Sequence, residues 1–306
     1  MSVEQPVTAP APVSKGKIFL RRLCSSILLW AVVLGALFSG NKLVSDYVFL
    51  AIMVLLVASG MIEFYGIVKG VGAFCFSKAG ILGGVLLIVA TFFYISGQAG
   101  TVGGSGSVND FESGVIILFV LGLCVRQFVS RASTKGIIAI STTLLGLMYV
   151  AWLLNFLQKI NFFGHGVDGN FYLLYFILVT KLSDCGAYVV GSLIGKHKMI
   201  PRVSPGKTWE GFFGAVVVST VASVVFAHVA GNHLLGMTLV HAVILGIVLS
   251  VSAVIGDLIE SIFKREAGLK DSGKLFPGIG GILDLLDSLL FNAPLMYLYM
   301  RLFLIP

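Results

Sequence analysis

Nine long apolar stretches constrain the fold of this chain more than any other feature of its sequence. They cover roughly residues 23–40, 47–68, 80–96, 114–130, 136–156, 171–195, 211–230, 239–262 and 286–304. A helix needs about 20 apolar residues to cross a bilayer, and inside lipid it must satisfy its own backbone groups. Only 11% of the 306 residues are charged, whereas an ordinary soluble domain has about 25%. The sequence therefore predicts an all-α, polytopic membrane protein with about nine transmembrane helices.

The basic residues predict the orientation of these helices. If the N-terminus is cytoplasmic, 17 of the 21 lysines and arginines fall in cytoplasmic segments, three fall on the opposite side, and Lys181 lies within a span. Cytoplasmic loops of membrane proteins are enriched in Lys and Arg. We therefore expect a cytoplasmic N-terminus and an external C-terminus. The formal charge of +7 then reflects topology, and we expect no nucleic-acid partner.

The N-terminal residues divide into a polar tail and a first span. Residues 1–17 are rich in Pro and Ala and predict a disordered tail, whereas 18–306 predict a single transmembrane helical domain. The stretch 17–40 is similar to a signal peptide, but no small-residue cleavage site follows it, which favours a retained span. The four scattered cysteines form no CxxC pair and indicate neither a disulfide framework nor a zinc site.

Two pairs of carboxylates lie near the cytoplasmic ends of the last two spans. Asp257 and Glu260 are three residues apart, as are Asp284 and Asp287, so each pair shares one helix face. Carboxylates gathered in one place repel one another unless a cation lies between them. Mg²⁺ prefers such oxygen ligands, often together with substrate phosphates, and no nearby His or Cys suggests zinc. The pattern predicts a site for a divalent cation such as Mg²⁺.

Two cytoplasmic loops place basic residues beside these acids. The loop 264–281 carries Lys264, Arg265, Lys270 and Lys274, and the loop 195–211 contains "SPGKTWEG" with Ser204 and Lys207. A helix that begins after this motif would present free N–H groups to an anion. Basic loops are also expected from topology alone. Because these loops lead into paired acids, we interpret them as phosphate-binding, which is typical of phosphoryl-transfer chemistry.

Two further acids within spans are open to more than one interpretation. Lys181 and Asp184 are three residues apart, so they form either an ion pair that lowers the cost of insertion or a part of the polar site. Glu63 is either a snorkelling or helix-pairing residue or a functional acid.

The stretch 184–288 resembles the phosphatidate cytidylyltransferase family, also called CDP-diacylglycerol synthases. The family signature, S-x-hydrophobic-K-R-x4-K-D followed by P-x-H-G-G-x2-D-R-x-D, is matched without a gap from Ser261 to Asp287. "DCGAY", "SPGKTWEG" and "IGDLIES" are similar to further family motifs. Two positions depart from the pattern: Ile279 replaces the usual His and Leu285 the usual Arg. Glu63 falls where the family tends to have an acid in an early span.

The resemblance implies that CTP and phosphatidate react to give CDP-diacylglycerol and pyrophosphate, in phospholipid biosynthesis. It places the catalytic signature region within 181–288. The implied metal ligands are Asp257, Asp284 and Asp287, for Mg²⁺ and an optional second cation. The implied catalytic residues are Lys264, Arg265, Lys270, Asp271 and Lys207; the substrate- and phosphate-binding set is Ser204, Lys207, Lys264, Arg265 and Asp184; and Glu260 and Asp271 would order these groups.

The expected partners are CTP, phosphatidate and membrane lipid, and a homodimer is possible. The expected location is the cytoplasmic membrane of a bacterium. Two rival functions remain open at this point. A CTP-dependent polyprenol or phytol kinase would need a base for its hydroxyl nucleophile. An ion-coupled transporter would also keep acids in its spans, but at several depths along a path. CDP-alcohol phosphatidyltransferases also pair aspartates, but their D-G-x2-A-R core is absent.

Overall fold

The structure is a computed structural model that describes residues 34–35, 38, 40–96, 105–129, 135–164, 166–270, 272–273 and 280–305. Within these ranges, eight helices are long and apolar enough to cross a membrane. Each coincides with one of the last eight predicted spans, so the prediction of an all-α, polytopic membrane protein is confirmed. The polar tail and nearly all of the predicted span 23–40 lie outside the described residues. The total of nine spans and the orientation of the termini stay predictions.

The elements follow one another along the chain as follows. They are α2 (Lys42–Gly70), α3 (Ser77–Ile95), α4 (Ser105–Val129), α5 (Gly136–Gly146), η2 (Leu147–Trp152), α6 (Leu153–Asn161), α7 (Gly169–Ile194), β1 (Lys198–Ile200), β2 (Ser204–Thr208), α8 (Trp209–Ala230), η3 (Gly231–His233), α9 (Leu239–Glu266), α10 (Ile282–Tyr299) and η4 (Met300–Leu304). The segments α5, η2 and α6 form one span, in which η2 is a turn of π-helix. The segments α10 and η4 form the last span.

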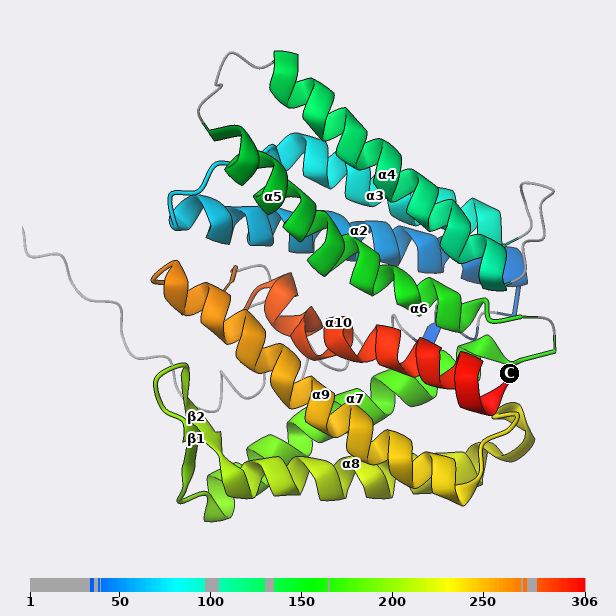
Figure 1. Cartoon of the computed structure of the whole chain (residues 1–306). Coiled ribbons are helices and arrows are strands. Elements are labelled where there is room, and N and C mark those ends of the chain that lie inside the picture. The colour runs from blue at the N-terminus through cyan, green and yellow to red at the C-terminus, as the bar shows by residue number, and fades with distance from the viewer. Residues whose placement is uncertain are drawn as a thin grey trace, which may run out of the picture.

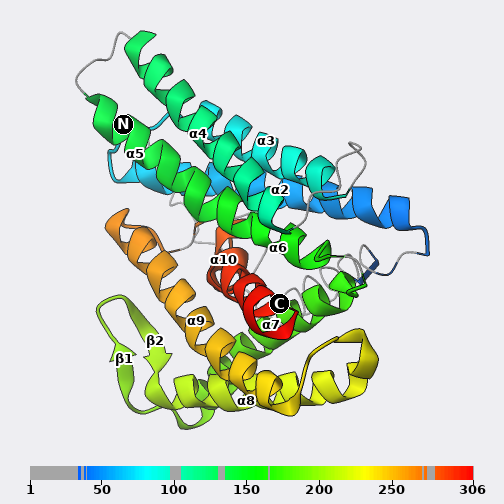
Figure 2. The same ribbon diagram turned by 45° about the vertical axis from the view of Figure 1, so that its right-hand side comes forward.

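Helix α10 is the central helix of the bundle. It packs on α9, α6, α2 and α7, and it belongs to the most buried of the eight spans. On one side of it α7, α8 and α9 pack on one another in sequence, and on the other side α2 packs on α3 (Figures 1 and 2). The two acidic helices, α9 and α10, are therefore neighbours, and α10 also contacts the N-terminal helices.

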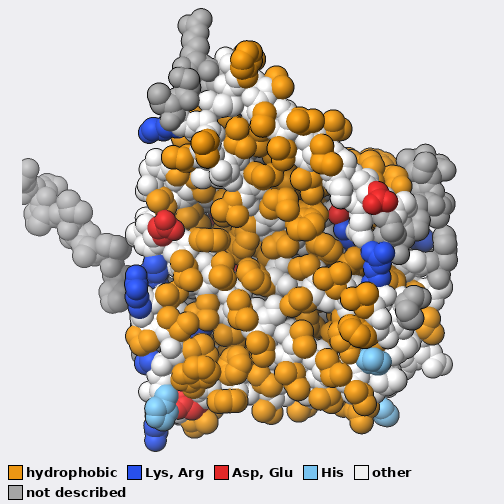
Figure 3. Space-filling view, in the orientation of Figure 1, with side chains coloured by type: hydrophobic (Ala, Val, Ile, Leu, Met, Phe, Trp, Pro, Cys, Tyr) orange, Lys and Arg blue, Asp and Glu red, His pale blue; other side chains and the backbone are white. Residues whose placement is uncertain are grey.

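The connections that carry most of the described basic residues lie at one end of the bundle. The α2–α3 turn, the end of α4, the start of α5, the β1–β2 hairpin and the end of α9 all lie toward the left of Figure 1, away from the C-terminus. Between the two ends, hydrophobic side chains cover the visible face (Figure 3). This surface is the one that a helical bundle surrounded by lipid requires. We call the end with the basic connections the basic end.

A small antiparallel sheet at the basic end was not predicted from the sequence. Lys198 of β1 pairs with Thr208 of β2, and Ile200 pairs with Ser204, with an irregular register between the two pairs. Thr208 then caps α8, because its hydroxyl accepts a hydrogen bond from the Gly211 N–H at 3.2 Å. The hairpin thus leads directly into α8.

The close approach of α9 and α10 depends on a glycine. A Cβ atom at Gly256 would lie 2.6 Å from the backbone oxygen of Asp287 and 3.2 Å from Cβ of Phe291. Because contacts under 3.0 Å are not tolerated, any larger residue would push α10 away from α9. This glycine immediately precedes Asp257, so the acids of both helices are brought close together.

Candidate functional site

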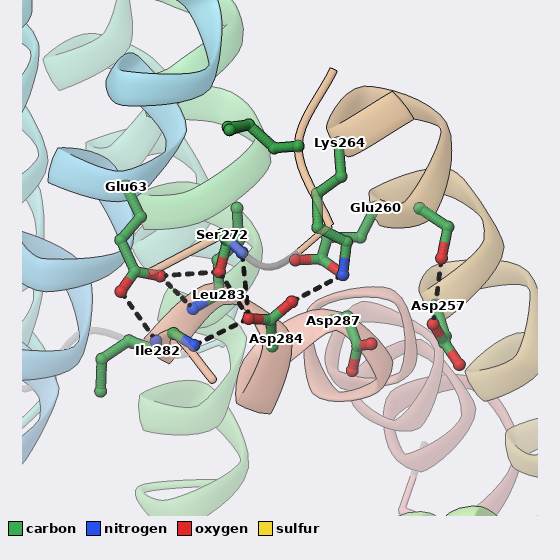
Figure 4. A network of polar contacts seen from close by, with 12 residues as sticks. Glu63, Asp257, Glu260, Lys264, Ser272, Ile282, Leu283, Asp284 and Asp287 are labelled. Carbon is green, nitrogen blue, oxygen red and sulfur yellow. Dashed lines mark hydrogen bonds and ion pairs between the residues drawn. The ribbon is translucent and has the colours of Figure 1, made fainter. Parts of the chain in front are cut away.

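Three carboxylates converge between α9 and α10 near the basic end of the bundle. One ligand oxygen from each of Asp257, Glu260 and Asp287 lies within 4.8 Å of the others. The spacing of Asp257 and Glu260 puts both on the face of α9 that meets α10, where Asp287 lies (Figure 4). We call these three residues the carboxylate cluster.

Burial differs sharply within the carboxylate cluster. The Glu260 side chain is 0% exposed and that of Asp257 is 38% exposed. Lys264 Nζ lies 2.5 Å from Glu260 Oε2 and forms an ion pair with it, whereas Oε1 has no hydrogen-bond partner among the residues that the structure describes. A fully buried carboxylate with one oxygen unpaired is costly, because the protein replaces only part of its lost hydration. Glu260 therefore has unused capacity to bind a cation.

Lysines surround the carboxylate cluster from three elements. Lys207 Nζ on β2 lies 2.8 Å from Asp257 Oδ2, and Lys264 Nζ on α9 lies 2.6 Å from Asp284 Oδ1. Lys181 Nζ on α7 lies 3.3 Å from Asp184 Oδ2. The carboxylates of this region are Asp184, Asp257, Glu260, Asp284 and Asp287. Glu63, which shares the Ser272 hydroxyl with Asp284, is a sixth, so six carboxylates against three ammonium groups leave a formal charge of −3, which a divalent cation would largely offset.

Asp284 is placed differently from the other predicted metal ligands. Its Oδ2 accepts hydrogen bonds from the N–H of Gly281 at 2.7 Å and from the N–H and hydroxyl of Ser272 at 3.1 and 2.9 Å. Its Oδ1 accepts one from Lys264 at 2.6 Å. The carboxylate thus caps α10 and holds Lys264 against Glu260. Its predicted role as a metal ligand stays a prediction, and Glu260 is the acid that joins Asp257 and Asp287 in the structure.

Glu63 of α2 caps the N-terminus of α10. Its carboxylate accepts hydrogen bonds from the N–H groups of Ile282 at 3.0 Å and Leu283 at 2.8 Å, and from the Ser272 hydroxyl at 3.0 Å (Figure 4). These N–H groups have no partner within the helix, and a negative charge favours the positive end of the helix dipole. Glu63 thus pairs α2 with the start of α10 beside the polar site and does not reach out to the lipid interface; a functional role for this acid stays a prediction.

Glycines make room for this carboxylate. A Cβ atom at Gly273 would lie 2.2 Å from Glu63 Oε1, and one at Gly281 would lie 2.4 Å from Glu63 Oε2. Any side chain at either position would therefore collide with Glu63. The glycines of the loop and of the α10 N-terminus are explained by an acid more than 200 residues away in sequence.

Asp184 lies on the α7 side of the same region. Its Oδ2 accepts a hydrogen bond from the hydroxyl of Ser288, the residue after Asp287, at 3.0 Å. Lys181 Nζ donates to the same hydroxyl at 3.0 Å and to the Leu285 carbonyl at 2.9 Å. The pair is thus both an ion pair and a part of the polar site. A positive charge is present beside Leu285, although the arginine of the family pattern is absent.

The remaining predicted residues lie around the hairpin and the loop after α9. Arg265 donates to the carbonyls of Val203 at 3.2 Å and Leu269 at 3.1 Å, so it ties the hairpin to the end of α9. Ser204 begins β2, and Lys270 is exposed. Asp271, Lys274 and Ile279 lie outside the described residues. Ser272 and Ser288 were missed, since a serine beside an aspartate carries no distinctive sequence signal.

The fold and this arrangement define a class: a polytopic membrane protein with an acidic, lysine-framed centre suited to a cation and phosphate groups. Comparison with known proteins gives the family. Residues 20–303 match the cytidylyltransferase family, and the chain belongs to that family.

Several curated bacterial proteins are similar to the chain over much of its length. A phosphatidate cytidylyltransferase of Staphylococcus haemolyticus is 37% identical over 204 residues, which is 61% of this chain and 76% of that protein. The protein of the same name from Haemophilus influenzae is 44% identical over 127 residues, 41% of this chain and 44% of that protein. The one from Mycobacterium bovis is 32% identical over 208 residues, 65% of this chain and 67% of that protein.

Proposed function

We propose that this chain is a phosphatidate cytidylyltransferase, which transfers the cytidylyl group of CTP to phosphatidate to give CDP-diacylglycerol and pyrophosphate. The family and the names of the relatives support this reaction. The observation that carries the proposal is the carboxylate cluster, with its buried Glu260, framed by lysines within a bundle of apolar helices. Such a centre suits one substrate dissolved in lipid and another that arrives from water.

The carboxylate cluster fits a divalent cation bound by oxygen. Asp257, Glu260 and Asp287 offer oxygen ligands alone, which suit Mg²⁺, and no His or Cys accompanies them in the cluster. The excess of negative charge and the unpaired Oε1 of Glu260 favour the same ion. We propose that these three residues hold Mg²⁺ and that Asp284 acts through Lys264. When bound, the ion neutralises the triphosphate and stabilises the leaving pyrophosphate.

The basic residues bind the phosphates in this proposal. Lys207 approaches the carboxylate cluster from the hairpin and Lys264 approaches it from α9, so they can grip a polyphosphate from two sides. Arg265 holds the hairpin in place, and Lys270 extends the positive charge toward the basic end. Together they offset the repulsion between two anionic substrates, which is the main obstacle to the reaction.

The reaction needs no strong general base. An oxygen of the phosphatidate phosphate, ionised at neutral pH, attacks the α-phosphorus of CTP, and the bond from that phosphorus to pyrophosphate breaks. The electron pair of that bond leaves with the pyrophosphate. A kinase that acts on a polyprenol must instead remove a proton from a hydroxyl group. The substitution of Ile279 for a family histidine is therefore compatible with activity.

The bacterial relatives favour a bacterial cytoplasmic membrane, where CTP is available on one side and phosphatidate within the bilayer. We propose that CTP enters from the basic end and that the lipid enters between helices. Whether two copies assemble as a dimer stays open.

The decisive experiment incubates the purified full-length chain with α-³²P-CTP, phosphatidate and Mg²⁺, followed by thin-layer chromatography of the lipid. Label in the lipid that depends on phosphatidate supports the proposal. Transfer from γ-labelled CTP to a polyprenol, with none from the α-label, would replace it with the kinase. Ion flux in proteoliposomes without CTP would favour the transporter.

A further inference from the structure

Tyr149 is a buried tyrosine that no sequence motif marks and that the reaction described above does not use. It lies on the π-helical turn η2, between α5 and α6, and is 7% exposed. Turns of π-helix are rare and occur frequently at functional sites, because the extra residue changes the direction in which side chains point. The span that carries Tyr149 belongs to the N-terminal half of the bundle, opposite the helices α7 and α8.

The ring of Tyr149 is held between the two acidic helices. Its centroid lies 5.4 Å from that of Phe263, one turn after Glu260 on α9, and 6.4 Å from that of Phe291, one turn after Asp287 on α10. Phe64, the neighbour of Glu63 on α2, lies 5.8 Å away on another side. These contacts fix the ring at the level of the carboxylate cluster.

The hydroxyl of Tyr149 has no hydrogen-bond partner among the residues that the structure describes. Three carboxylates act on it electrostatically, those of Glu260, Asp287 and Asp257, and these are the members of the carboxylate cluster. Oε1 of Glu260 also has no hydrogen-bond partner there, while Oε2 is paired with Lys264. A buried donor and buried acceptors thus share one region without bonding each other, although buried polar groups are nearly always paired.

Other buried tyrosines of the chain are satisfied. The Tyr65 hydroxyl donates to the Thr143 carbonyl at 2.8 Å, and the Tyr175 hydroxyl bonds that of Ser223 at 2.6 Å. Tyr172 donates to the Leu235 carbonyl. If packing were its only role, phenylalanine would serve equally well at position 149, and the three aromatic neighbours of Tyr149 named above are all phenylalanines. The hydroxyl of Tyr149 thus lacks a partner, and none of the described residues supplies one.

We propose that the Tyr149 hydroxyl donates a hydrogen bond to a phosphate oxygen of a substrate bound at the carboxylate cluster. This inference rests on the proposed function, because it takes the anion to be a phosphate of CTP or of phosphatidate. A neutral donor adds a hydrogen bond to the phosphate without adding charge, whereas the surrounding lysines neutralise it. Tyr149 then closes the site on the side of α2 and η2, opposite Lys207 and Lys181.

The test is Tyr149→Phe in the full-length protein, which removes the hydroxyl and keeps the ring. Tyr175→Phe is the matched control, because that hydroxyl is also buried and bonds Ser223, which keeps a second partner, the Ala242 carbonyl. CTP is titrated at saturating phosphatidate, and phosphatidate at saturating CTP. We expect kcat/KM to fall about tenfold or more in Tyr149→Phe, the loss typical of a hydrogen bond to a charged group, and to stay unchanged in the control.

A second readout is independent of turnover: the rise in melting temperature that Mg²⁺ with CTP, or phosphatidate alone, gives to each variant. A smaller rise in Tyr149→Phe with one ligand identifies that ligand as the source of the phosphate. Equal kinetics in Tyr149→Phe and the wild type would overturn the inference. So would a loss of activity accompanied by a lower melting temperature of the free protein and an undiminished rise with both ligands, because that pattern indicates packing alone.

The two proposals can fail separately. If the wild type makes no CDP-diacylglycerol, the proposed function fails, and the melting experiment still reports whether Tyr149 contacts a bound phosphate. If the wild type is active and Tyr149→Phe matches it in both readouts, only the role of Tyr149 fails.

Discussion

The backbone N–H of Leu283 at the start of α10 donates a hydrogen bond of 2.8 Å to the carboxylate of Glu63 on α2, 220 residues earlier in the chain. The same carboxylate also accepts from the N–H of Ile282. Helix α10 carries Asp284 and Asp287, so the position of both acids depends on an acid in a span outside the signature region.

Replacing Glu63 tests this dependence. Glu63→Gln removes the negative charge from the N-terminus of α10 and leaves one oxygen where two accept hydrogen bonds. We expect a loss of about 1–2 kcal/mol of stability, as for the loss of a helix cap with its charge, and reduced activity. Thermal unfolding in detergent and the cytidylyltransferase assay measure the two effects. Glu266→Gln, at an exposed acid of α9, is the control and should change neither.

The carboxylate cluster predicts which acids govern the requirement for metal. Glu260→Gln and Asp287→Asn should lower activity about a hundredfold or more, because each removes a charged oxygen ligand from the centre. Asp284→Asn should mainly lower stability and weaken the hold on Lys264. The Mg²⁺ concentration at half-maximal rate distinguishes the two groups of variants. If it rises in Asp284→Asn but not in Glu260→Gln, the ligand set inferred from the structure is wrong and the one predicted from the sequence is favoured.

Removal of the cation should affect stability as well as turnover. A ligand that binds only the folded state stabilises it by about 2.7 kcal/mol at one hundred times its dissociation constant. Mg²⁺ should therefore raise the melting temperature of the wild type, and a chelator should reverse the rise and stop turnover. Asp287→Asn should show a much smaller rise. Full activity in excess chelator would contradict a metal-dependent centre.

Lys207 links the hairpin to the carboxylate cluster. Its ammonium group lies 2.8 Å from Asp257 and donates to the Val254 carbonyl at 3.1 Å. Lys207→Met removes the charge while keeping most of the chain length, so we expect the KM for CTP to rise about tenfold or more. Lys198→Ala, at an exposed lysine of the same hairpin, should leave the KM unchanged. An equal effect of both changes would indicate a general effect of positive charge on the loop.

A second buried ion pair lies outside the carboxylate cluster. Lys159 on α6 pairs with Glu112 on α4, both side chains are 3% exposed, and Asn155 donates to the same carboxylate at 2.8 Å. Breaking such a pair leaves a buried charge without a partner, so Lys159→Met should cost about 3–5 kcal/mol. The double change Lys159→Met with Glu112→Gln should recover much of this loss in thermal unfolding. A double variant no more stable than the single one would show that the pair itself is not responsible.

The spans could be predicted from sequence, and the partners of the acids could not. Runs of apolar residues must become helices in lipid, so hydropathy alone located the eight described spans. The i, i+3 spacing predicted that Asp257 and Glu260 share a face, and so do Asp284 and Asp287. The spacing could not predict that the cluster of Asp257 and Asp287 would be completed by Glu260 rather than by Asp284. That choice depends on how α10 is rotated, which the close contact at Gly256 and the cap from Glu63 determine.

The hairpin and Tyr149 escaped prediction for a different reason. The strands β1 and β2 are three and five residues long and contain Pro205 and Gly206, so no alternation of apolar residues marks them. Tyr149 lies in a run of apolar residues, where a tyrosine resembles any other packing residue. Only the missing partner of its hydroxyl distinguishes it, and that is a property of the folded chain.

Because Glu63 bonds the start of α10, the site can form only after the last spanning helix of the described chain has been made. The ribosome completes α2 long before it reaches α10, the last spanning helix of the described chain. Until that final helix enters the bilayer, Glu63 has no α10 to cap and Asp257 has no Asp287 opposite it. A nascent or truncated polypeptide therefore lacks a formed carboxylate cluster, and it cannot turn over CTP until α10 has been inserted into the membrane.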